Sequence, residues 1–288
     1  MTAPTHPVLF ITVQYGNPSD TRAFLESVAA LDDSKSCQVI LVDNSPPGTS
    51  DPAFRVPDRY ESPLEVLVPP KNLYYWGGAA FALDIVRQRS KSLPRWTIIC
   101  NNDVMINQTD FLKRLAGIDP ITFPIIGPAV ISLTSHRDQN PMLQSYPGFL
   151  KRLKWRIYDV AYPIAKAMLA THRMLTSRAA ERGKSLPGGR RRIYAPHGAF
   201  VILSSAFFER GGSLDTQVAM FAEELTLAET AVKLGMPIWH FPDLQVTHGE
   251  HSTTGAKLTP AKYALERLAR RRYYNLRAAT PGVRDWQL

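Results

Sequence analysis

The sequence predicts an α/β protein with a mixed, mostly parallel sheet flanked by helices. Short apolar runs rich in β-branched residues alternate with segments of helical periodicity, which is the order expected for βαβ units. One such run, residues 96–100, is apolar apart from Thr97, as is typical of a strand buried on both faces of a parallel sheet. Asn101, Asn102 and Asp103 follow it directly, at the edge where open α/β sheets bind ligands.

The expected strands and helices follow in order. Strands are predicted at residues 8–13, 39–42, 65–68, 96–100, 125–131, 199–203, 238–241 and 244–247. Helices are predicted from near Ser19 or Asp20, from Gly77 to about Arg89, after Thr109 or Asp110, from Glu223 to Leu234, and from about Ala261 to Ala278. Ser, Thr and Asp favour helix starts as caps, and Gly235 followed by Pro237 favours a helix end.

Length and cysteine content limit the class of protein. A chain of 288 residues can form one large α/β domain or two small ones. Cys37 and Cys100 lie beside or within apolar strand runs, which favours buried free thiols and a reducing compartment. Residues 1–7 lack the basic start of a signal peptide, and no run of eighteen apolar residues occurs, so no membrane span is expected.

Positive charge is concentrated in two segments. Residues 149–192 have a net charge of +10 and residues 257–288 a net charge of +6, whereas the whole chain has +9. Such patches favour a polyanionic partner, either a nucleic acid or an anionic membrane. Aromatic residues lie among the cations, but no RNA- or DNA-binding motif accompanies them, so we expect no nucleic-acid partner. A solvated basic face without a partner is the other interpretation.

The first basic segment also has an amphipathic pattern. Its apolar residues follow helical spacing, with aromatic neighbours and a cationic start: Leu153, Ile157, Val160, Ile164 and Met168, with Trp155, Tyr158 and Tyr162, after Lys151, Arg152, Lys154 and Arg156. This combination favours a helix in a membrane interface. A core helix of an inserted subdomain is the alternative.

Polar residues at element ends are candidates for binding a nucleotide. Asp43 and Asn44 end the second strand, where a carboxylate can accept bonds from a ribose hydroxyl or a base N–H. Gly77 and Gly78 before a helix let a phosphate approach its N-terminal N–H groups. Asp103 could hold a divalent cation between diphosphate oxygens, because Mg²⁺ and Mn²⁺ prefer carboxylate ligands.

Three later residues are candidates for catalysis and metal binding. Glu223 and Glu224 begin a predicted helix, where acidic residues are favoured by the helix dipole alone but can also supply a general base. His248 follows a predicted strand, which makes it a candidate metal ligand as well as an ordinary polar residue.

Together these residues resemble a family 2 glycosyltransferase of the GT-A fold, closest to rhamnosyltransferase-like members of bacterial polysaccharide synthesis. Four blocks in order carry the resemblance: Leu41 to Ser45, Asn72 to Ala80, Cys100 to Val104, and His197 to Ser252. The last block contains Gly198-Ala199-Phe200, the turn Gly211 to Asp215, the acidic pair and His248. Tyr74 stands where family members commonly have Gly, Ala80 where Asn is frequent, and Thr226 where a second Asp is frequent.

The resemblance implies an inverting transfer from a nucleotide-diphosphate sugar of the dTDP or UDP type. Asp43, Asn44, Asn72, Gly77, Gly78, Asn102 and Asp103 would bind the donor, and Asp103 and His248 would bind Mn²⁺ or Mg²⁺. Glu224 would be the general base, in preference to Glu223, because it falls on the family's usual Asp. The basic segments suggest a lipid-linked saccharide acceptor and a peripheral location at the cytoplasmic face of an anionic plasma membrane.

The resemblance also implies a division of the chain. Residues 1–256 would form the GT-A domain, with a donor half at about 1–130, a basic insertion at about 149–192 and an acceptor half at about 193–256. Residues 257–288 would form a basic C-terminal helical segment. The altered acidic helix leaves a second interpretation open, a catalytically silent relative that binds carbohydrate or a partner protein.

Overall fold

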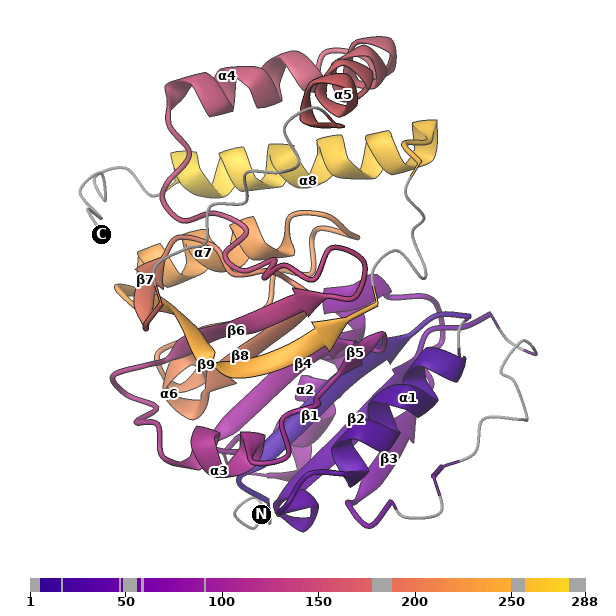
Figure 1. Cartoon of the computed structure of the whole chain (residues 1–288), viewed down its shortest axis with the longest axis vertical. Helices are drawn as coiled ribbons and strands as arrows, with labels where there is room; N and C mark the ends of the chain where they lie inside the picture. Colours follow the sequence, from indigo (N-terminus) through magenta and orange to yellow (C-terminus); the bar gives the residue numbers. More distant parts are fainter. Residues whose placement is uncertain are drawn as a thin grey trace.

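The fold is a mixed sheet flanked by helices, which confirms the predicted class (Figure 1). A computed structural model describes residues 6–16, 18–46, 48, 56–57, 60–90, 92–177, 188–249 and 257–279. Its strands are β1 (Val8–Gln14), β2 (Cys37–Asp43), β3 (Leu64–Leu67), β4 (Trp96–Asn101), β5 (Val104–Met105), β6 (Ile125–Ser132), β7 (Arg191–Ile193), β8 (Phe200–Ser204) and β9 (Ile238–His248). Its helices are α1 (Pro18–Ala29), a 3₁₀ turn (Ser34–Ser36), α2 (Tyr74–Arg89), α3 (Phe111–Ala116), α4 (Phe149–Tyr158), α5 (Tyr162–Ser177), α6 (Ser205–Glu209), α7 (Glu223–Leu234) and α8 (Pro260–Ala278).

The strand order determines which ends of the strands meet. Along the sheet the order is β3-β2-β1-β4-β8-β6-β9-β5, and β7 pairs with β9. Strands β3, β2, β1, β4, β6 and β9 run in one direction, whereas β8, β5 and β7 run in the other. The carboxyl ends of the parallel strands therefore lie at one edge of the sheet.

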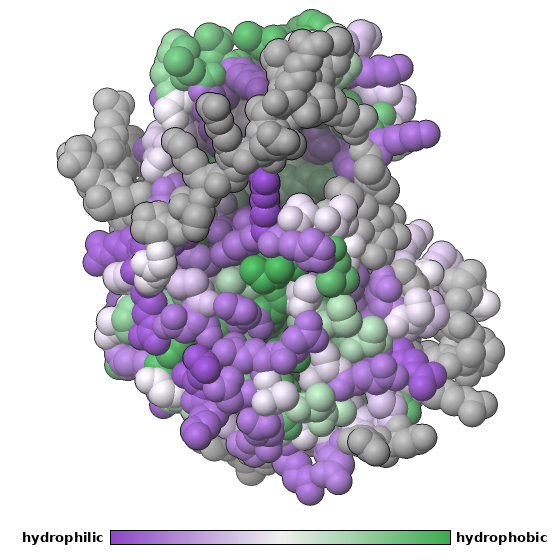
Figure 2. Space-filling view, in the orientation of Figure 1, coloured by the Kyte–Doolittle hydropathy of each residue, from purple (hydrophilic) through white to green (hydrophobic). Residues whose placement is uncertain are grey.

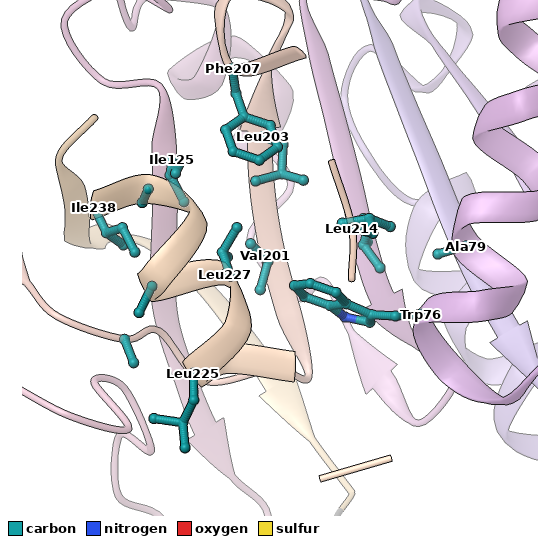
Figure 3. Close-up of a cluster of buried hydrophobic side chains, with 14 of the residues drawn as sticks. Trp76, Ala79, Ile125, Val201, Leu203, Phe207, Leu214, Leu225, Leu227 and Ile238 are labelled. Carbon is teal, nitrogen blue, oxygen red and sulfur yellow. The ribbon is translucent and has the colours of Figure 1, made fainter. Parts of the chain in front are cut away.

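Both faces of the sheet are covered, as the alternation along β1 shows. Leu9 and Ile11 pack in a cluster with residues of α2 and α7, whereas Val8 and Phe10 pack in a second cluster with residues of α1 and α3. Trp76 of α2 is 1% exposed and extends toward the side chains of β8 and α7 in the first cluster (Figure 3). The predicted buried free thiols, Cys37 and Cys100, are confirmed.

Further helices stack on the first face. Helix α8 lies on α7, and α4 and α5 lie on the far side of α8 (Figure 1). Within the described residues, no helix is both long and apolar enough to cross a bilayer.

Several predicted boundaries were wrong. Helix α2 begins at Tyr74 rather than at Gly77, and the predicted strands 238–241 and 244–247 form one strand, β9, with a register shift where it passes Pro128 of β6. The single amphipathic helix expected from Leu153 to Met168 is broken between α4 and α5, where Pro163 occupies the first turn of α5. Strands β5 and β7 and helix α6 were not predicted. Residues 178–187 of the basic insertion and 280–288 of the C-terminal segment lie outside the described residues.

Candidate active site

The topology brings distant parts of the chain to one edge of the sheet. In the parallel register Gln14 pairs with Asp43, and Val13 pairs with Asn101. The reversed strand β8 presents its beginning at the same edge, because Phe200 pairs with Cys100. The end of β9 arrives there too, since His248 pairs with both Ser132 and Val104. The sheet thus places polar strand ends side by side, as in other open α/β sheets.

A cleft of about 680 Å³ opens at this edge, a size suited to a small-molecule ligand. Seven of the predicted site residues line it: Asn44, Asn72, Asn102, Asp103, Glu223, Glu224 and His248. Asp43, Gly77 and Gly78 are outside its lining. Asp43 is the last residue of β2 and directly precedes Asn44. Its carboxylate accepts a hydrogen bond of 3.0 Å from the Ser45 N–H.

Asp103 and His248 form a close pair in the cleft. Asp103 Oδ1 lies 3.3 Å from His248 Nε2, and both side chains are 9% exposed. On the other side of the ring, His248 Nδ1 donates to Gln139 Oε1 at 2.8 Å. A proton on Nδ1 leaves Nε2 of the neutral ring as an acceptor, and Asn101 Nδ2 lies 3.4 Å from it as a donor.

This arrangement fits a divalent cation. Two ligands about 2.1 Å from a metal and at about 90° to each other lie about 3 Å apart, close to the observed separation. Carboxylate oxygen and imidazole nitrogen suit Mn²⁺, and Gln139 supplies the outer hydrogen bond that commonly orients a metal-binding histidine. No group of three or more His, Cys, Asp or Glu side chains with metal-binding geometry occurs within the residues that the structure describes. Further ligands would therefore come from other groups, such as donor phosphate or water.

The three asparagines of the predicted site connect neighbouring elements. Asn44 accepts from the Leu73 N–H at 3.2 Å and donates to the Tyr74 carbonyl at 2.8 Å, which ties the end of β2 to the start of α2. Asn72 accepts from the Tyr74 N–H at 2.7 Å. Asn102 donates to Thr21 Oγ1 of α1 at 3.0 Å. These bonds connect the loops that border the cleft to α1 and α2.

Close packing accounts for Gly78. A Cβ atom there would lie 3.2 Å from both Asn44 Nδ2 and Val13 Cγ1, so those side chains would have to shift by a few tenths of an ångström to accept it. Because α2 begins at Tyr74, its N-terminal N–H groups belong to residues 74–77.

Two residues that line the cleft have left-handed backbone: Tyr74 has φ of +59° and Phe221 has φ of +69°. Left-handed backbone at a larger side chain is strained and is concentrated at functional sites.

The acidic pair lies where the first turn of α7 meets the cleft. Glu224 Oε1 accepts from the Gly198 N–H at 3.1 Å, and the Gly198 carbonyl accepts from the Tyr75 hydroxyl at 2.9 Å. Burial raises the pKa of Glu224. Burial, and secondarily the charge of Glu224, raises the pKa of Glu223 to about 8. Glu223 is 6% exposed, whereas Glu224 is partly exposed, so Glu224 has the better access to a ligand.

The raised pKa of Glu223 predicts a pH-dependent stability. A carboxyl group whose pKa is higher in the folded state stabilises the fold below its unfolded pKa and loses that contribution as pH rises toward 8. We therefore expect the Glu223→Gln variant to gain stability relative to the wild type between about pH 5 and pH 8, on the order of a few kcal/mol. Urea denaturation of both proteins across this range measures it. A stability difference that is constant with pH would contradict the prediction.

Several cleft residues were not predicted from the sequence. Gln139 follows β6 with no motif around it, and Lys262 belongs to α8, which was treated as a separate C-terminal segment. His197 lies in a block already singled out, and its ring centroid is 5.5 Å from that of His248. Tyr75 also lines the cleft. In the sequence, the one signal that pointed to it was its position close to Gly77 and Gly78.

Comparisons with known proteins give the fold a context. No protein-family model matches the chain, and neither does the sequence of any curated protein. Solved structures do match. S. aureus TarS (residues 1–349) in complex with UDP-GlcNAc aligns with a TM-score of 0.56 and 15% identity over 91% of this chain and 65% of its own. GalNAc-T7 with UDP, GalNAc and Mn²⁺ aligns with a TM-score of 0.58 and 13% identity over 93% of this chain and 48% of its own.

A third match is the mannosyltransferase PcManGT from Pyrobaculum calidifontis in complex with GDP-Man and Mn²⁺, with a TM-score of 0.50 and 16% identity over 96% of this chain and 75% of its own. These structural neighbours are glycosyltransferases, and the chain shares their GT-A-like fold. The chain spans 36%, 60% and 65% of three TarS structures, so it corresponds to only part of that protein.

Proposed function

We propose that this protein is an inverting glycosyltransferase that moves a sugar from a nucleotide-diphosphate donor to a hydroxyl group of a saccharide acceptor. One observation carries the proposal: at the ligand-binding edge of a GT-A-like sheet, a single cleft contains both the Asp103–His248 pair and the Glu224 carboxylate. The pair suits a cation beside a diphosphate, and the carboxylate suits a base for the acceptor.

In this proposal Glu224 is the general base. It takes the proton of the acceptor hydroxyl, whose oxygen attacks the anomeric carbon from the face opposite the diphosphate. The bond between that carbon and the diphosphate oxygen breaks, its electron pair leaves with the diphosphate, and the configuration inverts. The hydrogen bond from the Gly198 N–H fixes one carboxylate oxygen of Glu224, while the raised pKa makes the group a better proton acceptor.

Asp103 and His248 are the proposed ligands of Mn²⁺ or Mg²⁺. When bound, the cation would offset negative charge on the leaving diphosphate. Asn44, Asn72 and Asn102 shape the donor side of the cleft. Asp43 would bind the nucleoside, and the N-terminal turn of α2, which ends at Gly77 just before Gly78, would bind the phosphates.

The finer assignment follows the sequence resemblance to family 2 enzymes. We propose a dTDP- or UDP-linked donor, with rhamnose as a candidate sugar, and a role in bacterial cell-surface polysaccharide synthesis. Residues of about 1–130 would bind the donor, and residues of about 193–256 would bind the acceptor. The basic insertion at about 149–192 and the segment 257–288 support a lipid-linked acceptor and a peripheral position on the cytoplasmic face of the membrane.

A thermal-shift screen tests the proposal directly. The protein is mixed with UDP, dTDP and their sugars, each with Mn²⁺, with Mg²⁺ or with chelator. A ligand at 100 times its Kd stabilises the native state by about 2.7 kcal/mol, so a metal-dependent rise in melting temperature is expected with the correct nucleotide. If a well-folded sample responds to none of them, the transferase proposal fails and the silent relative is favoured.

A further inference from the structure

The outer face of α4 exposes a continuous row of large apolar side chains. Four residues make up this surface, which we call the α4 stripe: Phe149, Leu150, Leu153 and Ile157. Their exposed fractions are 68%, 79%, 41% and 45%. Val160 and Ile164 extend the row past the break into α5, with 62% and 38% exposed. Hydrophobic side chains gather at the top of the molecule in Figure 2, where α4 lies in Figure 1. An apolar surface of this kind commonly marks a binding face.

The geometry of the helix groups these residues on one side. At 3.6 residues per turn, the four positions of the α4 stripe fall within an arc of about 100°. Lys154 lies just beyond one border of this arc and Arg156 just beyond the other. Trp155 lies almost opposite its centre. An apolar centre with cations along both borders is the pattern of a helix that lies in a membrane interface.

The opposite face of α4 is held by α8, so the stripe faces away from the protein. The Trp155 ring packs edge-on against Tyr273 at 6.2 Å, and the Tyr158 ring contacts Tyr263 at 5.8 Å. The Tyr158 hydroxyl also donates to Glu266 at 2.8 Å. Trp155 and Tyr158, which the sequence suggested for a membrane belt, therefore anchor the helix, and the α4 stripe remains exposed.

The exposed charged side chains around the α4 stripe are positive. Lys151, Lys154, Arg156 and Lys166 are exposed. Within residues 149–171 the one acidic side chain is Asp159, which is 13% exposed and pairs with Arg270 of α8 at 2.7 Å. A surface with exposed cations and an inward-facing acid complements an anionic surface and repels a second copy of itself.

We propose that the α4 stripe, with Val160 and Ile164, docks this protein on an anionic phospholipid bilayer, with the flanking lysines and Arg156 at the headgroups. The inference extends the lipid-linked part of the proposed function by identifying the surface that meets the membrane. Helix α8 lies between this surface and the cleft, because α8 contributes Lys262 and Leu265 to the cleft lining and packs on α4. Because α4 and α8 both separate the α4 stripe from the cleft, a docked α4 would hold the cleft about two helix diameters, roughly 20 Å, from the stripe.

Vesicle co-sedimentation of the full chain tests the surface without donor or acceptor, so its outcome does not depend on transferase activity. At about 50 mM salt, where screening is weak, we expect binding to phosphatidylcholine vesicles containing phosphatidylglycerol and little binding to pure phosphatidylcholine. The double variant Leu150→Glu/Leu153→Glu should lower the partition coefficient about 100-fold. Lys154→Ala should lower it about fivefold.

Ile121→Glu is the matched control. Ile121 is 65% exposed and follows α3, which Figure 1 places at the other end of the molecule from α4. The Ile121→Glu variant should bind vesicles as the wild type does. Circular dichroism should show that all variants are folded. Equal binding to neutral vesicles, no wild-type binding, or an equal loss in Ile121→Glu would overturn the proposal. So would a wild-type dimer that Leu150→Glu/Leu153→Glu converts to a monomer, since a second copy would then cover the stripe.

Discussion

Glu224→Gln should lower kcat for sugar transfer by about 100- to 10,000-fold, while the Kd of the nucleotide-sugar donor changes little. The amide keeps the volume of the side chain, and its oxygen can still accept from the Gly198 N–H, but it cannot take a proton. The measurement is steady-state transfer to a saccharide acceptor, together with donor binding by thermal shift.

Glu223→Gln is the matched control, because it makes the same chemical change one residue away in the same cleft. We expect a smaller effect, since Glu223 is buried and its Oε2 accepts from the Ala222 N–H. If Glu223→Gln loses activity and Glu224→Gln keeps it, the roles of the two residues are reversed. If both variants keep full activity, the general base lies elsewhere.

Asp103→Asn should abolish the metal-dependent part of nucleotide binding and lower metal-dependent activity by at least 100-fold. The substitution preserves shape but removes the negative charge that faces His248 Nε2 at 3.3 Å, and a neutral amide is a much weaker ligand for Mn²⁺ or Mg²⁺. Thermal shift with UDP or dTDP compounds, with and without Mn²⁺, measures the loss.

Two further variants make this test specific. Gln139→Ala removes the hydrogen bond to His248 Nδ1 and should weaken metal affinity about 10- to 100-fold, a smaller effect than the loss of a ligand. Asp84→Asn removes the charge of an aspartate on α2 whose side chain is 66% exposed, and it should behave as the wild type does. A full metal-dependent shift in Asp103→Asn would show that Asp103 does not hold the cation.

Local patterns determined most of the secondary structure. Helix α7 has the predicted bounds because its end is set locally: Gly235 adopts φ of +67°, which a residue without Cβ accepts readily. Strand β4 was recognised from its run of large apolar and β-branched residues, which is typical of burial on both faces. The start of α2 was misjudged because Tyr74, a bulky residue, adopts the left-handed backbone that the sequence rules assign to glycine.

Some residues of the candidate site could be predicted from the sequence, and others could not. Asp103, Glu223, Glu224 and His248 stand at the ends of elements, so their positions along the chain already indicated one edge of a sheet. Gln139 could not be found in this manner, because its contact with His248 joins residues 109 positions apart and depends on the parallel pairing of β6 with β9. Lys262 reaches the cleft only through the packing of α8 on α7.

The sequence by itself determined the α/β class, the order of the main strands and helices, and the residue types available for chemistry, because hydrophobic periodicity and end signals act over a few neighbours. Only the tertiary structure decided that β9 continues past its register shift, that His248 meets Asp103 and Gln139, and that α4 turns Trp155 and Tyr158 inward and the α4 stripe outward. These features depend on contacts between residues far apart in the chain. Local sequence patterns do not specify such contacts, because they reflect only neighbouring residues.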